Sequence, residues 1–541
     1  MAPIFSFFRR VGENPLFWFL LTVGFTLLYF FAEHEGFYFG DDFSYGLYAH
    51  QLLYGGFHFD DYSFCHRFMV FVPTALFYWL WGMNAYTTTL WPLLCTLGTY
   101  MVLFLTFRKN HPVASSWALV LMGFYYFQLN TVNYLYPDNI LLFFSTACLL
   151  VLYKARQPLP NPQSEIGYGV LFAVLNLLAF LTKETIVYAA PFYFLVFLYH
   201  LLRKENLRFW AAAILSGALL LGVYFLLYKV YAGNAWQRFD DIAAAGYADT
   251  KADYFAARAT MLLSRLTYGP LVFFAGSGLA ILLAPAVAGL ALAKRGDFQV
   301  QKPFGFWAFA TLVMLFPIWF GSVSLEYYKP MTLLPRMFHP LLPAFCLLAG
   351  LAVERIWGDK KAYLLLALLF LGSMAVTDKV MWTMYLPLAI FFTVLFFWRR
   401  AVPHWLALAA VMLVSLIRPV YFITKPTVSY YFEQKQIIDQ HLSSPVGSHV
   451  VVTDSMMARM HPFFYGYQVP KNYTYLPYSA ADSSILQQAD TVFLLINNGV
   501  LEHPELMMPL REKDVLPKFS QARLIAQEGK VKLYLLPPKK R

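Results

Sequence analysis

The chain has few charged residues, and this shortage excludes a water-soluble protein. Charged residues make up 13% of its 541 positions, whereas 59% are hydrophobic, 19% are aromatic and the mean hydropathy is +0.52. The formal net charge of +11 comes from Lys and Arg that fall mostly in short connectors between apolar runs. That distribution is typical of membrane topology, so nucleic-acid binding is excluded and a polytopic membrane protein is indicated.

Cysteine is also scarce. Cys95, Cys148 and Cys346 lie in apolar runs, and Cys65 lies in a loop. This pattern provides neither a disulfide framework nor the spacing of metal ligands, so we expect all four to be packing residues. A small-residue cleavage site is missing after the first apolar run, Leu16–Ala32, which we therefore interpret as a retained signal anchor.

The apolar runs predict about 13 transmembrane helices. Phe68–Trp81 is not among them, because about 14 residues extend only about 21 Å as a helix, against a hydrocarbon core of about 30 Å. The expected spans lie near 16–32, 86–107, 113–130, 137–153, 166–182, 185–202, 208–231, 268–293, 303–322, 336–353, 361–377, 380–398 and 404–423. They place the basic connectors on one side, so we expect the N-terminus inside and the C-terminus outside the membrane. Residues 1–424 would form this transmembrane domain.

The first outer loop, residues 33–85, is expected to contain two helices that lie along the membrane surface. Apolar residues recur at helical spacing from Tyr45 to Leu53, and Gly55-Gly56 ends this stripe. The second helix follows Arg67. The acid pair Asp41-Asp42 opens the first helix, so its carboxylates and Arg67 would face the space between the two helices.

The composition changes from about Lys425. Apolar runs shorten to strand length at 450–453 and 492–496, and a terminal hairpin is predicted around 522–525 and 532–536. We interpret residues 425–541 as a small soluble α/β domain on the extracytoplasmic face. No Gly-rich phosphate loop follows the first two strands, so the sequence gives no indication of nucleotide binding there.

Charged residues on the expected outer face are few, which makes them informative, because outer loops are normally poor in Lys and Arg. The cations include Arg67, Lys183, Lys329 and Arg336, and the acids on the same face include Asp41, Asp42, Asp60, Asp61, Asp138 and Glu184. A membrane-embedded cavity with such side chains can deprotonate an alcohol while it stabilises a phosphate leaving group.

Several segments, in order along the membrane part, resemble one family. They are FGDDFSYGLYAHQLLYGG (39–56), CHRFMVFVPTALFYWLWGMNAY (65–86), YPDNILLFFSTACLLVLY (136–153), LLAFLTKETIVYAAPFYF (177–194) and LLPRMFHPLLPAFCLLAG (333–350). Their order and spacing resemble the lipid-linked-sugar glycosyltransferases of the GT-C fold. The similarity is greatest to bacterial relatives of the protein O-mannosyltransferases and to the aminoarabinose transferases of lipid A.

The resemblance implies an enzyme of the bacterial cytoplasmic (inner) membrane that moves a sugar from a polyprenyl-phosphate donor to an acceptor hydroxyl on the extracytoplasmic face, with inversion at the anomeric carbon. It implies that Asp41 is the general base, with Asp42 as the second catalytic candidate. The residues implied for the lipid phosphate are Arg67, Lys183 and Arg336. The residues implied as supports are Asp138, Glu184 and His66. No cofactor is required, a divalent metal is compatible but not implied, and the acceptor is a protein, lipid or glycan.

The chain departs from the family pattern in two places. Glu184 stands where the aminoarabinose branch usually has Gly after the Thr-Lys pair, which argues against that donor. There is no Asp-x-Asp, which argues against the metal-dependent oligosaccharyltransferase branch.

Structural roles compete with these functional ones. Asp is a favoured N-cap that stabilises a helix by roughly 1 kcal/mol, so we expect one acid of the Asp41-Asp42 pair to cap its helix and the other to react. Arg67 could anchor its helix at the head groups. Asp138 follows Pro137 at a normal helix start, and Lys183 with Glu184 could form a simple turn.

Two other functions stay open. A flippase or transporter of lipid-linked saccharides would line a pathway with these charges, although the sequence has no internal repeat of the kind that many transporters show. An O-antigen ligase or polymerase would be expected to place its basic residues in one large outer loop, whereas here they are scattered over short turns.

Overall fold

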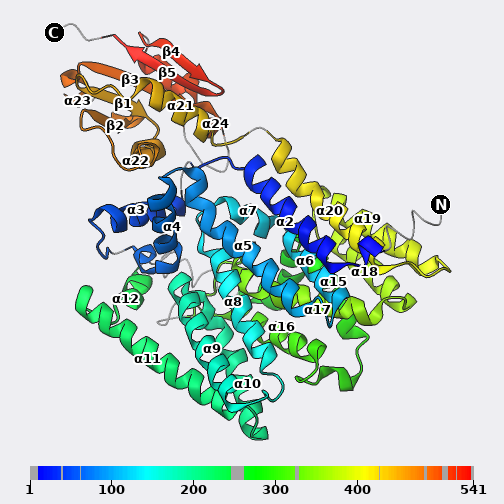
Figure 1. The fold of residues 1–541 in the computed structure, drawn as a ribbon. Coiled ribbons are helices and arrows are strands. Elements are labelled where there is room, and N and C mark those ends of the chain that lie inside the picture. Colours follow the sequence, from blue (N-terminus) through cyan, green and yellow to red (C-terminus); the bar gives the residue numbers. More distant parts are fainter. Residues whose placement is uncertain are drawn as a thin grey trace.

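A large body of helices and a small sheet domain make up the protein (Figure 1). The computed structural model describes residues 10–37, 40–60, 62–244, 261–322, 328–425, 427–480, 484–502, 510–519 and 521–537. We call the end of the helical body next to the sheet domain the domain side.

Ten helices among these residues are long and apolar enough to span a membrane. They are α2 (Pro15–Ala32), α5 (Ala85–Phe107), α8 (Pro137–Lys154), α9 (Pro162–Thr182), η3 with α10 (Glu184–Arg203), α11 (Leu207–Tyr231), α16 (Pro303–Phe320), η5 with α17 (Pro335–Ile356), α19 (Lys379–Phe397) and α20 (His404–Thr424). An eleventh span would be formed by α14 (Gly269–Gly276) and α15 (Leu279–Ala291), which are bent by 120° at the break between them. The protein is therefore an integral membrane protein.

Two expected spans are shorter as continuous helices. The apolar run near 113–130 divides into α6 (Pro112–Gly123, 12 residues), α7 (Tyr126–Asn130) and η2 (Thr131–Asn133). The run near 361–377 forms α18 (Lys360–Ala375), which has 16 residues. The count of about 13 spans and the inside and outside assignment therefore stay predictions.

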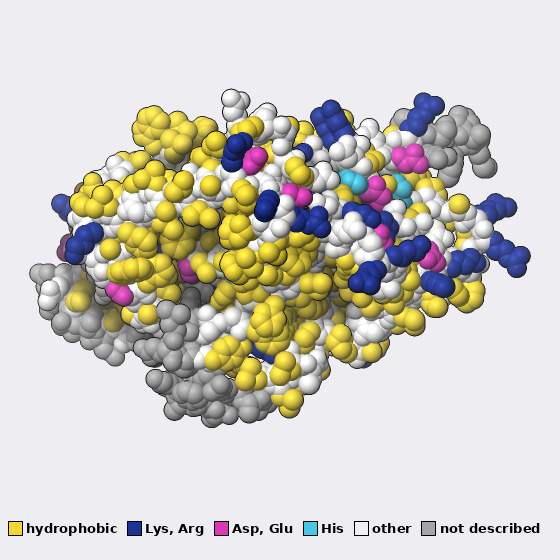
Figure 2. Space-filling model, turned by 90° about the horizontal axis from the view of Figure 1, so that it is seen from below, with side chains coloured by type: hydrophobic (Ala, Val, Ile, Leu, Met, Phe, Trp, Pro, Cys, Tyr) yellow, Lys and Arg dark blue, Asp and Glu magenta, His cyan; other side chains and the backbone are white. Residues whose placement is uncertain are grey.

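The surface of the helical body fits a lipid environment. Figure 2 shows a face that is mostly hydrophobic, with Lys and Arg gathered toward one end. Helix α11 is the most exposed of the candidate spans, since only 17% of its apolar window is buried inside the protein. All four cysteines are buried and free, as the sequence predicts.

The first loop contains both predicted helices. α3 (Asp41–Tyr54) ends at Gly55, whose φ of 91° favours glycine. η1 (Ser63–His66) then leads into α4 (Phe68–Trp81), which packs against α3. The following span, α5, begins with a capping box between Asn84 and Thr87.

The sheet domain has five strands in the order β2-β1-β3-β5-β4. β1 (His449–Thr453) is parallel to β2 (Tyr473–Pro477) and β3 (Thr491–Asn497), whereas β5 (Val531–Leu536) is antiparallel to β3 and β4 (Arg523–Glu528). Strand β1 is buried at every position because the sheet is covered on both faces. The short elements around it are α21 (Tyr431–His441), α22 (Ser455–Phe464), η6 (Tyr478–Ala480), α23 (Ser484–Gln488), α24 (Asn498–Glu502), α25 (Glu512–Val515) and η8 (Leu516–Phe519).

Hydrogen bonds and helix packing hold the sheet domain against the first loop. The Tyr467 hydroxyl donates to the carbonyl oxygen of Phe43 at 2.6 Å, and α22 packs against α3. The Ser429 hydroxyl donates to the carbonyl oxygen of Glu35 at 2.7 Å. The domain therefore fixes the position of α3, the helix that begins with the acid pair.

Candidate active site

The carboxylate of Glu184 bridges two arginines from different loops. Arg67, the residue before α4, donates from Nη2 to Glu184 Oε1 at 3.0 Å. Arg238 lies on α12 (Gln237–Ala244), and its Nη2 is 3.5 Å from Glu184 Oε2. Glu184 opens η3 directly after α9, so both guanidinium groups meet at the turn between two candidate spans.

The Arg67 side chain is buried and contacts several neighbouring side chains. Its side chain is only 5% exposed, and Nη1 donates to the Tyr45 hydroxyl at 2.6 Å. Its guanidinium carbon also lies 4.6 Å from the centre of the Phe64 ring. An arginine that only anchored its helix at the head groups would be exposed, so the alternative of a simple anchor is not supported.

Lys183 and Asp138 form a second buried pair. Lys183 ends α9, and its Nζ donates to Asp138 Oδ1 at 2.8 Å and to Met337 Sδ at 3.5 Å. Asp138 is the second residue of α8, and no side chain caps that helix. The ion pair therefore joins the domain-side ends of two spans, which a simple turn at Lys183 would not require. Nearby, Arg336 on η5 lies over the Tyr136 ring, 4.9 Å from its centre.

The two acids of the Asp41-Asp42 pair occupy different environments. Asp42 is 1% exposed, and its Oδ1 accepts a hydrogen bond from the backbone N–H of Leu135. Its Oδ2 is buried without a hydrogen-bond partner among the described residues. Asp41, the first residue of α3, is partly exposed. The expectation that one acid caps the helix is wrong, because the N-cap position is taken by Gly40 and no side chain makes a cap bond there.

The two carboxyl groups also differ in what shifts their pKa. Burial raises the pKa of Asp42 to about 8, an effect that the Leu135 N–H opposes and the Asp41 charge reinforces. Burial also raises the pKa of Asp41, but the charges of Arg336 and Arg67 oppose this rise. At neutral pH Asp42 therefore carries a proton, and the nearby cations favour the ionised form of Asp41.

His66 connects the first loop to α11 and α12. Its Nε2 lies 2.7 Å from Asp241 Oδ2, and its Nδ1 lies 2.9 Å from the Tyr228 hydroxyl. Burial lowers the pKa of His66, although Asp241 opposes this. Since Asp241 is on α12, His66 fixes that helix against the first loop and so supports the position of Arg238.

Sequence reasoning missed α12 and its charged residues Arg238 and Asp241. Arg238 is 1% exposed, stacks on the Phe180 ring at 4.1 Å and donates from Nη2 to the Phe180 carbonyl oxygen at 2.7 Å. Its Nε and Nη1 have no hydrogen-bond partner within the described ranges. The signal was present in the segment QRFDD, because an acid pair follows a long apolar run there just as it does at Asp41-Asp42.

The other expected outer charges lie elsewhere or are not described. Asp60 accepts hydrogen bonds from the Tyr48 hydroxyl at 3.1 and 2.8 Å, and Asp61 lies outside the described residues. The backbone N–H of Lys329 donates to the Ser322 hydroxyl at 3.0 Å. No group of three or more His, Cys, Asp or Glu side chains in the described part of the chain is arranged to bind a metal ion.

An apolar cavity of about 420 Å³ lies between α9, α10 and α11. Its walls are almost entirely hydrophobic, and they include Phe180, Phe225 and Phe239. Phe180 links the cavity to the charged cluster, because its ring also stacks on Arg238.

Comparison with known proteins identifies the fold. No protein-family profile and no curated protein matches this chain. Among solved structures, ArnT from Cupriavidus metallidurans in the apo state superposes with a TM-score of 0.56 and 15% identity, over 96% of this chain and 97% of its own. The same protein bound to undecaprenyl phosphate gives a TM-score of 0.54 and 15% identity, over 96% and 98%. The chain therefore has the fold of ArnT, a GT-C fold, as its sequence segments implied.

Proposed function

We propose that the protein transfers a sugar from a polyprenyl-phosphate donor to an acceptor hydroxyl, with inversion and with Asp41 as general base. One observation carries this proposal. The carboxyl group of Asp41 is partly exposed, and the positive charges of Arg336, Arg67 and Lys183 lower its pKa against the effect of burial. Its neighbour Asp42 has a pKa of about 8 and is neutral at pH 7. A base beside several cations is the arrangement that such a transfer needs.

The chemistry is a single displacement. Asp41 takes the proton of the acceptor hydroxyl while its oxygen attacks the anomeric carbon from the face opposite the phosphate. The bond between that carbon and the phosphate oxygen breaks, and its electron pair leaves with the lipid phosphate. Arg67 and Arg336 neutralise the charge that develops on the departing oxygen, and Asp41 later releases its proton to water.

A lipid donor is supported by the cavity of about 420 Å³ and by its hydrophobic walls. A polyprenyl chain gains free energy in such a cavity, and its phosphate would then lie near Arg238 and Arg67. The solved structure of ArnT with undecaprenyl phosphate gives a precedent for such a lipid on this fold. The extracytoplasmic face, the sugar and the acceptor belong to the proposal and are open to experiment.

The first experiment compares glycans and glycolipids, by mass spectrometry, between cells with the intact gene and cells in which it is deleted. A sugar that disappears from one acceptor identifies both substrates. Restoring the wild-type gene should restore the product, whereas Asp41→Asn should not restore it although the protein reaches the membrane.

The second experiment uses purified protein and undecaprenyl phosphate as probe. Binding should weaken in Arg67→Ala and stay near the wild-type level in Asp41→Asn, because only the first variant loses a cation. Normal glycosylation by Asp41→Asn would refute the base assignment. Movement of the donor across vesicles without any glycosylated product would instead favour a flippase.

A further inference from the structure

An arginine lies within a candidate span, α20, that packs against α7. Arg418 belongs to α20, whose window has a mean hydropathy of 2.2. Its guanidinium carbon lies 4.2 Å from the centre of the Tyr126 ring and 4.6 Å from that of Phe127. In the part of the chain that the structure describes, it makes no ion pair or hydrogen bond. A charge inside a span normally has an anionic partner or marks a functional site.

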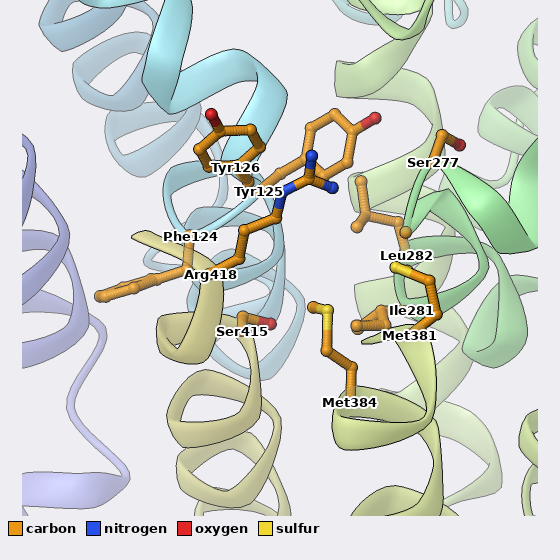
Figure 3. Close-up of a pocket in the computed structure, with 11 residues that line it drawn as sticks. Phe124, Tyr125, Tyr126, Ser277, Ile281, Leu282, Met381, Met384, Ser415 and Arg418 are labelled. Carbon is orange, nitrogen blue, oxygen red and sulfur yellow. The ribbon is translucent and has the colours of Figure 1, made fainter. Parts of the chain in front are cut away.

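Arg418 lines a small cavity of about 20 Å³ between the junction of α6 and α7, α15, α19 and α20 (Figure 3). Met381 and Met384 of α19 form one wall, and Leu282 of α15 forms another. The enclosed space fits about one water molecule, or one oxygen atom of a larger group that stays outside. No carboxylate is among the described residues that line it.

Two further features of this cavity favour an anionic oxygen. Tyr125 is 5% exposed, and its hydroxyl interacts with the Ser277 side chain but makes no hydrogen bond within 3.5 Å among the described residues, so it can turn to donate to a ligand. The 120° break between α14 and α15 also brings Gly278, the N-cap of α15, into the lining, and no side chain caps that helix. The first N–H groups of α15 and its dipole are therefore available to negative charge.

The depth of the cavity suggests the source of that charge. Arg418 precedes the end of α20, Thr424, by roughly 9 Å along the helix, and Met381 is near the start of α19. Both positions are at the domain side of the body, since α20 leads into the sheet domain. Phosphate groups of membrane lipids are concentrated at this depth, at the boundary of the hydrocarbon core.

We propose that Arg418, Tyr125 and the N-terminus of α15 form a binding site for one oxygen of a phosphate group. The phosphate belongs to a lipid head group, or it is free phosphate from the aqueous side. The guanidinium supplies the charge, and the Tyr125 hydroxyl and the α15 N–H groups supply directed donors. The site is separate from the cluster around Glu184 and does not depend on the proposed transfer reaction.

Native mass spectrometry of the purified, detergent-solubilised protein tests this proposal, with phosphatidylglycerol as the lipid probe. The apparent Kd for phosphatidylglycerol should rise about tenfold in Arg418→Gln, because a charge-assisted hydrogen bond is lost. Arg418→Lys should recover part of the affinity, and Tyr125→Phe should weaken binding without a change of charge. Lys379→Gln is the matched control, because it removes an exposed cation at the start of α19.

Titration with inorganic phosphate distinguishes the two sources. If phosphate at millimolar concentration displaces the Arg418-dependent lipid, the site also takes the free ion. If only phosphatidylglycerol binds, the site is specific to a lipid. Equal binding by wild type and Arg418→Gln in both titrations would overturn the proposal. If Arg418→Gln cannot be purified, unchanged binding in both Arg418→Lys and Tyr125→Phe would overturn it equally.

Discussion

The backbone N–H of Leu135 donates to Oδ1 of the Asp42 carboxyl group, across a sequence separation of 93 residues. This bond fixes the start of α3 to the segment that precedes α8. It also keeps a carboxyl group buried in a place where burial raises its pKa to about 8. The protonation of Asp42, at the start of α3, should therefore change with pH near neutrality.

The stability of the protein should depend on pH through Asp42. Its pKa is raised from 3.8 to about 8 in the folded protein, so the folded state binds the proton more tightly than the unfolded chain. The stabilisation by the proton is full below about pH 4 and is lost as the pH rises to about 8. Asp42→Asn mimics the protonated form, so its melting temperature should exceed that of wild type by an amount that grows over this interval. Thermal unfolding in detergent measures this difference, and parallel curves for the two proteins would contradict the assignment.

Loss of the proposed base should reduce turnover without unfolding the protein. Asp41→Asn should lower kcat by about 10²- to 10⁴-fold, the usual contribution of a positioned general base, with little change in donor binding. Asp42→Asn should have a smaller effect, because that group is already neutral at pH 7. Transfer assays on both purified variants provide the measurement, and near-normal turnover by Asp41→Asn would remove it from the mechanism.

Arg67 should determine how well the donor is used. Arg67→Ala should raise the apparent KM for the donor, and Arg67→Lys should recover only part of the loss, because lysine lacks the two-pronged guanidinium. Arg336→Ala should act in the same direction. Donor titrations measure these effects, and unchanged titrations in all three variants would exclude a phosphate site at these residues.

The pair of Lys183 and Asp138 should matter for stability. Lys183→Met leaves Asp138 buried without its cation, which costs about 3–5 kcal/mol for a buried pair. The double variant Lys183→Met with Asp138→Asn removes both charges and should recover most of this loss. Unfolding midpoints of the two variants provide the test. Equal destabilisation in the single and double variants would show that the charge of Asp138 is not the cause.

The orientation in the membrane can be tested with fusion reporters. The basic residues after Phe107 favour the inside, and about 13 spans would place the C-terminus outside. A reporter fused after Phe107 should therefore read cytoplasmic, and one fused at Arg541 should read extracytoplasmic. A cytoplasmic signal at Arg541 would mean that a span is miscounted and that the sheet domain lies on the other side.

The sequence predicted the elements whose signals are local. The helices on either side of Gly55 and Arg67 follow from apolar spacing and from the glycines that end it. Strand β2 was missed, because YTYLP is short and ends in proline. The bridge at Glu184 could not be predicted, because its bonds join residues 117 and 54 positions apart. Only the folded chain brings Arg238 to that carboxylate.

The carboxylate of Glu184 occupies the space between Arg67 and Arg238. A phosphate that binds to these arginines must therefore exchange with an anion that belongs to the protein itself. Such an exchange lowers the affinity for the donor, but it lowers the affinity for the spent lipid phosphate in the same way. Under the proposed function, the carboxylate would act as a tethered competitor that returns the two arginines to their starting partner and speeds the departure of the carrier after each turnover.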